Sequence, residues 1–303
     1  RDCLLSRGLG DVYKRQGKGW KLNYQQTLYP SSKFSTSDYL IDNYPYVYTD
    51  EDGTDHYFIK ETIDGNTTYK DEDGLKLELT INSSSASERY TIKDDKNNKL
   101  IFNSDGVLVK TVDSNSNAVK INLDSAKGIS TIEDPFGDKL TFNRNSEHCI
   151  TKVTNSAGKA RSFSYDNSDR LIMITNPDGG TIKFEYDSDG SMTSVTDTDG
   201  YKVCFGYTSL NSGKKVSSVT EYASDGTAGQ KITFSRNEYN LTNIRSAGLD
   251  GVFGNSDDCV SVYQFDNLGR TISVENRLQS GEKMGAAVYS YTDGQADTSK
   301  NNL

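Results

Sequence analysis

The sequence has very few of the side chains on which most enzyme and metal sites depend. Its 303 residues include only two histidines, His56 and His148, and neither stands in an H-x-x-H or E-x-x-H spacing. Zinc ligands and general bases commonly use histidines at such spacings. No G-x-S-x-G segment or cysteine motif indicates an activated nucleophile. We therefore expect no catalytic residues and no resident cofactor, and both histidines are expected to be ordinary strand or turn residues.

Long apolar runs and basic patches are also missing. The longest apolar runs are only a few residues, far below the roughly 18 that a membrane span needs. The formal net charge is −9, and no basic stripe stands out, which disfavours binding to nucleic acid. Leu, Ile, Val and Phe total 63 of 303 residues, close to the level of about 20% below which a chain can stay disordered. The pattern of these residues must therefore decide between order and disorder.

Cysteine is scarce, and the cysteines show no paired spacing. Beyond Cys3 there are Cys149, Cys204 and Cys259, at intervals of 55 residues and without a C-x-x-C motif. An odd number of cysteines is unusual in an oxidising compartment. Two alternatives remain open: these three cysteines are buried free thiols in strands, or two of them form a disulfide.

Part of the N-terminus has the sequence of translated adapter DNA. Residues 6–16, SRGLGDVYKRQ, are what a transposon-based sequencing-library adapter encodes when read in frame. The alternatives are a basic N-terminal arm and a signal-peptide remnant, but no apolar h-region or A-x-A cleavage site follows. We expect residues 1–16 to be an adapter artefact and the true start of the protein, with any secretion signal, to be missing.

What the sequence does contain is a repeat of 21 residues. Four glycines are separated by this interval, namely Gly137, Gly158, Gly179 and Gly200. The residue three positions before each of them is Asp or Asn, and this combination is typical of a type I turn. Aspartate outnumbers glutamate by 31 to 12, which also favours turns over helices.

Alternating apolar residues follow the repeat glycines. After Gly179 the alternation runs through Ile182, Phe184 and Tyr186, and this period of two predicts a β-strand. A second strand rich in β-branched residues follows in each unit, so each unit is predicted to be a hairpin. Weaker copies extend the array over residues 86–279. No segment has a sustained apolar period of 3.6 residues, so no long helix is predicted. The fold class is therefore all-β, with repeated antiparallel hairpins that gain order by stacking.

Three segments of this array resemble the motif of the YD-repeat, or Rhs, family. They are Tyr165-Asp166-Asn-Ser-Asp-Arg170, Tyr186-Asp187-Ser-Asp-Gly190 and Phe265-Asp266-Asn-Leu-Gly269-Arg270. The segment Gly17-Lys-Gly19-Trp20 is similar to the G-x-G-W segment that opens the ordered body of such proteins. The resemblance spans nearly all of residues 17–279.

The resemblance implies a curved, shell-like sheet in a secreted or cell-wall-associated bacterial protein. In related proteins the shell encloses a C-terminal toxin used in contact-dependent competition, which makes this chain a non-catalytic structural fragment. The implied organisation is an entry region at 17–85, the array at 86–279 and a linker at 280–303 toward a downstream module. The alternative is a cell-surface adhesin or carbohydrate-binding module, with cell-wall polymer or a glycan as its partner.

Two further features each have two interpretations. Asp250, Asp257 and Asp258 lie in a glycine-rich loop. This loop is either a calcium site formed by the carboxylate oxygens or a solvated hairpin connection. The aromatic stripe is either cross-strand packing or a ladder for stacking sugars. It consists of Phe163, Tyr165, Phe184, Tyr186, Phe205 and Tyr207.

Overall fold

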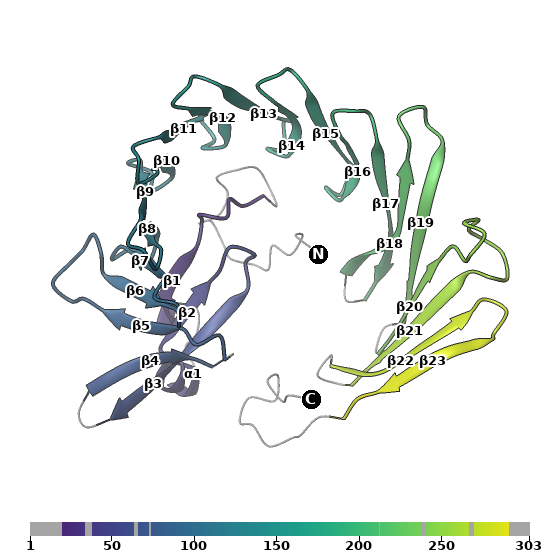
Figure 1. The fold of residues 1–303 in the computed structure, drawn as a ribbon, viewed down its shortest axis with the longest axis horizontal. Helices are drawn as coiled ribbons and strands as arrows, with labels where there is room; N and C mark the ends of the chain where they lie inside the picture. Colours follow the sequence, from purple (N-terminus) through teal and green to yellow (C-terminus); the bar gives the residue numbers. More distant parts are fainter. Residues whose placement is uncertain are drawn as a thin grey trace. The chain divides into compact units, whose positions relative to one another are not determined.

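The chain folds almost entirely into antiparallel β-strands. The computed structural model describes residues 20–33, 38–63, 66–72, 74–211, 213–237, 240–266 and 270–290. These residues divide into two compact units, which separate after Gly179. Figure 1 labels the strands of the first unit as β1 to β14 and those of the second as β15 to β23. The adapter-like residues 1–16 and the end of the chain, 291–303, lie outside the described residues. The all-β prediction is confirmed.

The first unit contains strands β1 to β14 and two short helical segments. A single 3-10 turn, η2 (Ser31–Lys33), and a six-residue helix, α1 (Asp38–Asn43), separate β1 from β2. The strands are β1 (Thr27–Pro30), β2 (Tyr46–Thr49), β3 (Asp55–Ile63), β4 (Asn66–Asp71), β5 (Glu78–Ile81), β6 (Tyr90–Lys93), β7 (Lys99–Phe102), β8 (Leu108–Val112), β9 (Ala118–Leu123), β10 (Ile129–Glu133), β11 (Lys139–Arg144), β12 (Ile150–Asn155), β13 (Ala160–Tyr165) and β14 (Leu171–Thr175).

The second unit contains strands β15 to β23. They are β15 (Thr181–Tyr186), β16 (Met192–Thr196), β17 (Lys202–Leu210), β18 (Gly213–Tyr222), β19 (Ala228–Arg236), β20 (Leu241–Ser246), β21 (Cys259–Phe265), β22 (Thr271–Leu278) and β23 (Lys283–Val288). None of the helices in the described part of the chain is long and apolar enough to cross a membrane.

Within each unit every strand pairs antiparallel with the next strand along the chain. In β11 and β12, for example, Leu140 lies opposite Asn155 and Phe142 lies opposite Val153. Strands β17 and β18 stay paired almost to their connection, and their register runs as far as Leu210 opposite Gly213. Strand β23 lies in the segment 280–303, for which a linker was expected, and it pairs with β22. The hairpin pattern thus extends further than the repeat indicated.

Most hairpins are closed by the same turn. In the turn that begins at Asp134, the backbone N–H of Gly137 donates to the Asp134 carbonyl at 3.2 Å. The Asp134 Oδ1 also accepts bonds from the backbone N–H groups of Phe136 (2.8 Å) and Asp138 (2.9 Å). This is a three-residue hairpin loop with an Asx cap, and its third loop residue must adopt a positive φ. The Asp and Gly of each repeat are therefore explained by turn geometry.

Several turns place a residue other than glycine at that third position. Ser116 has a φ of 70° in the turn that Asp113 begins. We expect Ser116→Gly to raise the free energy of unfolding by about 0.5–1 kcal/mol, because it relieves left-handed strain of about 1–2 kcal/mol at some entropic cost. Ser114→Gly, in the same turn but without a positive φ, should instead lower it slightly. Urea denaturation of both variants checks this, and equal effects would contradict it.

The larger hydrophobic core lies in the first unit. Leu28 of β1, Phe58 of β3, Phe102 of β7 and Leu108 of β8 have exposed fractions of 0%. Strand β1 lies against the turn between β7 and β8, because Leu28 N–H donates to the Gly106 carbonyl at 2.9 Å. The second unit has few buried apolar side chains among its described residues, and most of its strand positions are half-buried on both faces. Its hairpins therefore rely mainly on strand pairing and turn caps.

Candidate functional site

The residues of the family motif cap hairpin turns and, at Tyr165, also reach the neighbouring hairpin. The Asp166 Oδ1 accepts from the backbone N–H groups of Ser168 (2.9 Å) and Arg170 (3.0 Å), and its Oδ2 accepts from Arg170 Nε at 2.6 Å. Asp266 binds Arg270 in the same way, with Oδ1 on the backbone N–H at 2.9 Å and Oδ2 on Nε at 2.7 Å. The aspartate of the motif is thus a turn cap. The middle of the Asp266 turn, residues 267–269, lies outside the described residues.

The tyrosine hydroxyl reaches back to the preceding hairpin. Tyr165 donates to the carbonyl of Ile150 at 2.6 Å, and Tyr207 donates to the carbonyl of Met192 at 2.6 Å. Both bonds span 15 residues. Burial raises the pKa of Tyr165 and of Tyr207, so both hydroxyls stay protonated donors. A shift of register directly before Tyr165, and again before Tyr207, redirects the side chain toward that carbonyl.

The other repeat residues also serve the backbone. Gly137, Gly158, Gly179 and Gly200 have φ values of 92°, 78°, 91° and 89°, which L side chains rarely adopt. Tyr186 ends β15 just before the turn cap Asp187, and the side chain of Phe184 is buried. Whether the aromatic stripe also stacks sugars stays a prediction.

The histidines and cysteines in the described part of the chain belong to no group of three that could hold a metal ion, although His148 and Cys149 are consecutive. His148 has a φ of 64° at the third position of a hairpin turn, whereas His56 is buried and contacts Asp50 Oδ2 through Nε2 at 3.1 Å. Cys149 is a buried free thiol, and Cys204 and Cys259 are half-buried free thiols. Each of these residues belongs to a strand or a hairpin turn of the repeat array or of the region before it.

The three aspartates of the glycine-rich loop have different environments. Asp258 is fully buried, and its Oδ2 accepts from Arg245 Nε (2.6 Å) and from the Gly254 N–H (2.9 Å). Asp250 binds Val252 N–H and the Asn255 amide, while Asp257 Oδ2 lies 3.5 Å from the Asp250 N–H. Within the described ranges, no group of three or more His, Cys, Asp or Glu side chains could hold a metal ion. Calcium binding at Asp250, Asp257 and Asp258 stays a prediction.

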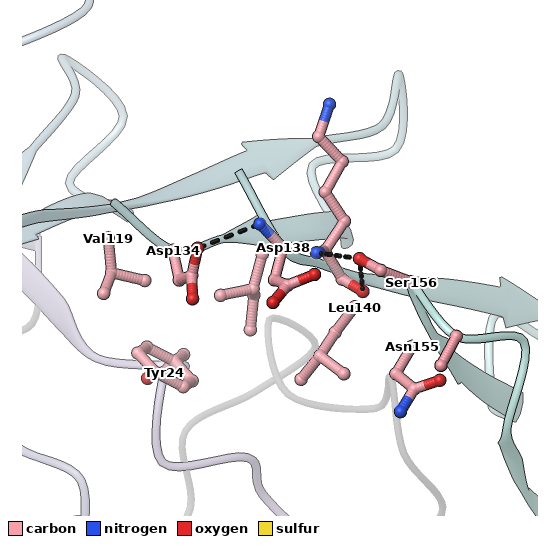
Figure 2. A pocket seen from close by; sticks show the side chains of 10 residues that line it. Tyr24, Val119, Asp134, Asp138, Leu140, Asn155 and Ser156 are labelled. Carbon is pink, nitrogen blue, oxygen red and sulfur yellow. Dashed lines mark hydrogen bonds between the residues drawn. The ribbon is translucent and has the colours of Figure 1, made fainter. Parts of the chain in front are cut away.

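A pocket of about 390 Å³ opens in the first unit, between Tyr24, in the segment that precedes β1, and strands β9 to β12. Figure 2 shows Tyr24 on one side of this space and Asp134, Asp138, Leu140 and Asn155 on the other. The remaining lining residues are Val119, Ile132, Lys139, Ser156 and Ala157. The repeat turns at Asp134 and Asn155 place the polar groups at its rim, because each turn ends a strand that borders the pocket.

The pocket was not predicted from the sequence. Tyr24 is separated from the next lining residue, Val119, by more than ninety positions, and no motif links them. Asp134 was recognised as a turn residue, but nothing in the repeat indicated that Asp138 would share a cavity with an aromatic ring. Only the packing of the N-terminal segment on the sheet brings these side chains together.

Turn capping makes stability depend on pH. Hydrogen bonds from Asn117 lower the pKa of Asp113, and a hydrogen bond from Lys214 lowers the pKa of Asp187. For Asp258, burial acts to raise the pKa, but hydrogen bonds from Gly254 and Arg245 outweigh it and lower the pKa. Carboxyl groups with a lowered pKa in the folded state stabilise it above their unfolded pKa of about 3.9 and lose that effect as the pH falls below it.

We therefore expect the urea midpoint of unfolding to be constant from pH 7 to about pH 5 and to fall steeply below about pH 4. Denaturation curves at a series of pH values measure this. The variant Asp113→Asn keeps an acceptor for the turn but cannot titrate, so its midpoint should fall less steeply. A midpoint that stays constant down to pH 2.5 would contradict the prediction.

Comparison with known proteins finds one matching family model. A family model described as the teneurin YD-shell matches residues 71–279. No curated protein matches the chain.

Two solved structures show a distant likeness to the chain. A crystal structure of TcdB2-TccC3 has 10% identity and a TM-score of 0.34, over 78% of this chain and 19% of that chain. The Tc holotoxin pore of Photorhabdus luminescens has 10% identity and a TM-score of 0.33, over 75% of this chain and 16% of that chain. The chain thus spans less than a fifth of the length of these structures.

Proposed function

This chain belongs to the teneurin YD-shell family, and on that premise we propose that it is part of the wall of a β-shell that surrounds another segment of the same full-length polypeptide. The family match over residues 71–279 carries the proposal. The uninterrupted pairing of strands within each unit supports it, because a wall needs continuous backbone hydrogen bonding. The enclosed segment is a C-terminal toxin, and the shell acts outside the producing cell.

The chain has no catalytic role in this proposal. Its polar side chains serve mainly as turn caps and as ties between neighbouring hairpins, as Asp166 and Tyr165 do. Chemical activity belongs to the enclosed segment, and the repeat array keeps that segment away from solvent and from proteases.

Protease protection of the full-length gene product tests the proposal. The C-terminal segment should survive limited proteolysis while the shell is folded and should be digested once urea unfolds the shell. The same segment expressed alone is the control and should be digested at once. Rapid digestion within the folded full-length protein would refute enclosure. Selective binding of this chain on a glycan array would then favour the adhesin alternative.

A further inference from the structure

The pocket between Tyr24 and strands β9 to β12 has a surplus of hydrogen-bond acceptors. Asp134 uses Oδ1 for its turn, which leaves Oδ2 available at the rim. Among the described residues, no hydrogen bond to the Asp138 carboxylate is formed. The Ser156 hydroxyl is engaged by the backbone N–H of Lys139 at 2.7 Å. A ligand that fills this pocket must therefore bring donors.

The pocket also carries an uncompensated negative charge. Among the described residues that line it, Lys139 alone is basic, and the Lys139 ammonium group pairs with Glu133 at 3.1 Å. The charges of Asp134 and Asp138 are then left for a ligand. Two carboxylates around a concave site attract a cation, and because Asp138 is exposed this attraction is screened by salt.

The remaining walls fit an aliphatic chain that ends in a cation. Val119, Ile132 and Leu140 are apolar and line the space beside the carboxylates. The ring of Tyr24 lies across the space from Leu140 (Figure 2), and an aromatic face attracts an ammonium or guanidinium group within about 6 Å. Lysine and arginine side chains combine a methylene stem with such a head group.

We propose that this pocket binds the side chain of a lysine or arginine residue of a partner polypeptide. The carboxylates of Asp138 and Asp134 bind its head group, and Tyr24 with the aliphatic residues holds its stem. A sugar fits less well, because a neutral polyhydroxyl ligand would leave the charges of both carboxylates uncompensated. The inference concerns a binding site and does not depend on whether the shell encloses a toxin.

The test measures the binding of fluorescein-labelled pentapeptides to the whole chain, with fluorescence anisotropy as the readout. The probes are Gly-Gly-Arg-Gly-Gly, Gly-Gly-Lys-Gly-Gly and an uncharged counterpart with citrulline at the centre. We expect the two cationic peptides to bind and the citrulline peptide to bind at least tenfold more weakly. Affinity for the cationic peptides should fall as salt is added, because the pocket is open to solvent.

Two substitutions identify the site, and a third serves as a control. Asp138→Asn removes one acceptor charge, and Tyr24→Leu removes the ring; each should weaken binding of the arginine peptide about tenfold or more. Glu147→Gln removes the same charge from an exposed position of the same unit and should leave binding unchanged. Circular dichroism of each variant verifies that the fold is kept.

Three results would overturn the proposal. The first is equal binding of the arginine and citrulline peptides, and the second is equal effects of Asp138→Asn and Glu147→Gln. The third is binding of a neutral oligosaccharide, such as a chitin fragment, that depends on Tyr24 in the absence of peptide binding. That last result would assign the pocket to glycans.

Discussion

Gly106→Ala is expected to lower the free energy of unfolding of the first unit by about 3 kcal/mol or more. Gly106 has a φ of 75°, where an L side chain is strained by about 1–2 kcal/mol. A Cβ at this position would lie 2.1 Å from the Leu28 carbonyl oxygen and 2.8 Å from a ring carbon of Tyr29. The backbone of β1 cannot withdraw without losing its bond to the Gly106 carbonyl, so overpacking adds to the strain.

Gly137→Ala is the matched control for this substitution. Gly137 has a φ of 92° in an equivalent hairpin turn, but no atom lies within 4 Å of a Cβ built there. Its substitution should cost only about 1–2 kcal/mol, from backbone strain alone. Urea denaturation followed by the fluorescence of Trp20, the only tryptophan, measures both variants. Equal losses would show that β1 does not lie against the Gly106 turn.

Phe102→Ala is expected to cost about 3–5 kcal/mol, because it removes a fully buried ring from the core of the same unit. Phe102 has an exposed fraction of 0% and contacts Tyr48 edge to face, with ring centroids 6.0 Å apart. The substitution removes the ring's transfer free energy and leaves a cavity, since paired strands on both sides prevent β7 from collapsing into the space.

Phe136→Ala provides the comparison for the buried ring. The Phe136 side chain is 92% exposed at the tip of a hairpin turn, so its loss should change the free energy of unfolding by no more than about 0.5 kcal/mol. Both variants are measured by urea denaturation under identical conditions. A loss below 1 kcal/mol for Phe102→Ala would mean that the core is more loosely packed than the structure shows.

The repeat allowed the hairpins to be predicted because their geometry is local. Asp or Asn at one position and glycine three residues later determine a turn, and apolar alternation determines the strands on either side. The turn at Asp134 and Gly137 and the strand through Phe184 were predicted on these grounds and are confirmed. Turns such as the one with Ser116 at the positive φ were harder to recognise, because no glycine marks them.

The parts that were not predicted depend on contacts between distant segments. The ion pair with Arg245 accompanies the burial of Asp258, one of the three loop aspartates, and composition alone cannot show this. The bond from Leu28 to Gly106 and the meeting of Tyr24 with Asp138 each join residues more than seventy positions apart. A 21-residue period describes neighbouring hairpins and says nothing about where the N-terminal segment lies on them.

The pairing of each strand with its neighbour in sequence has a consequence for how the chain folds. Contacts such as those between β15, β16 and β17 join residues close in sequence, so each hairpin can form as soon as its two strands are available. A chain that emerges gradually from a ribosome or a secretion channel can therefore fold progressively, hairpin by hairpin. The contact of β1 with the Gly106 turn is different, because it forms only after about eighty further residues have emerged.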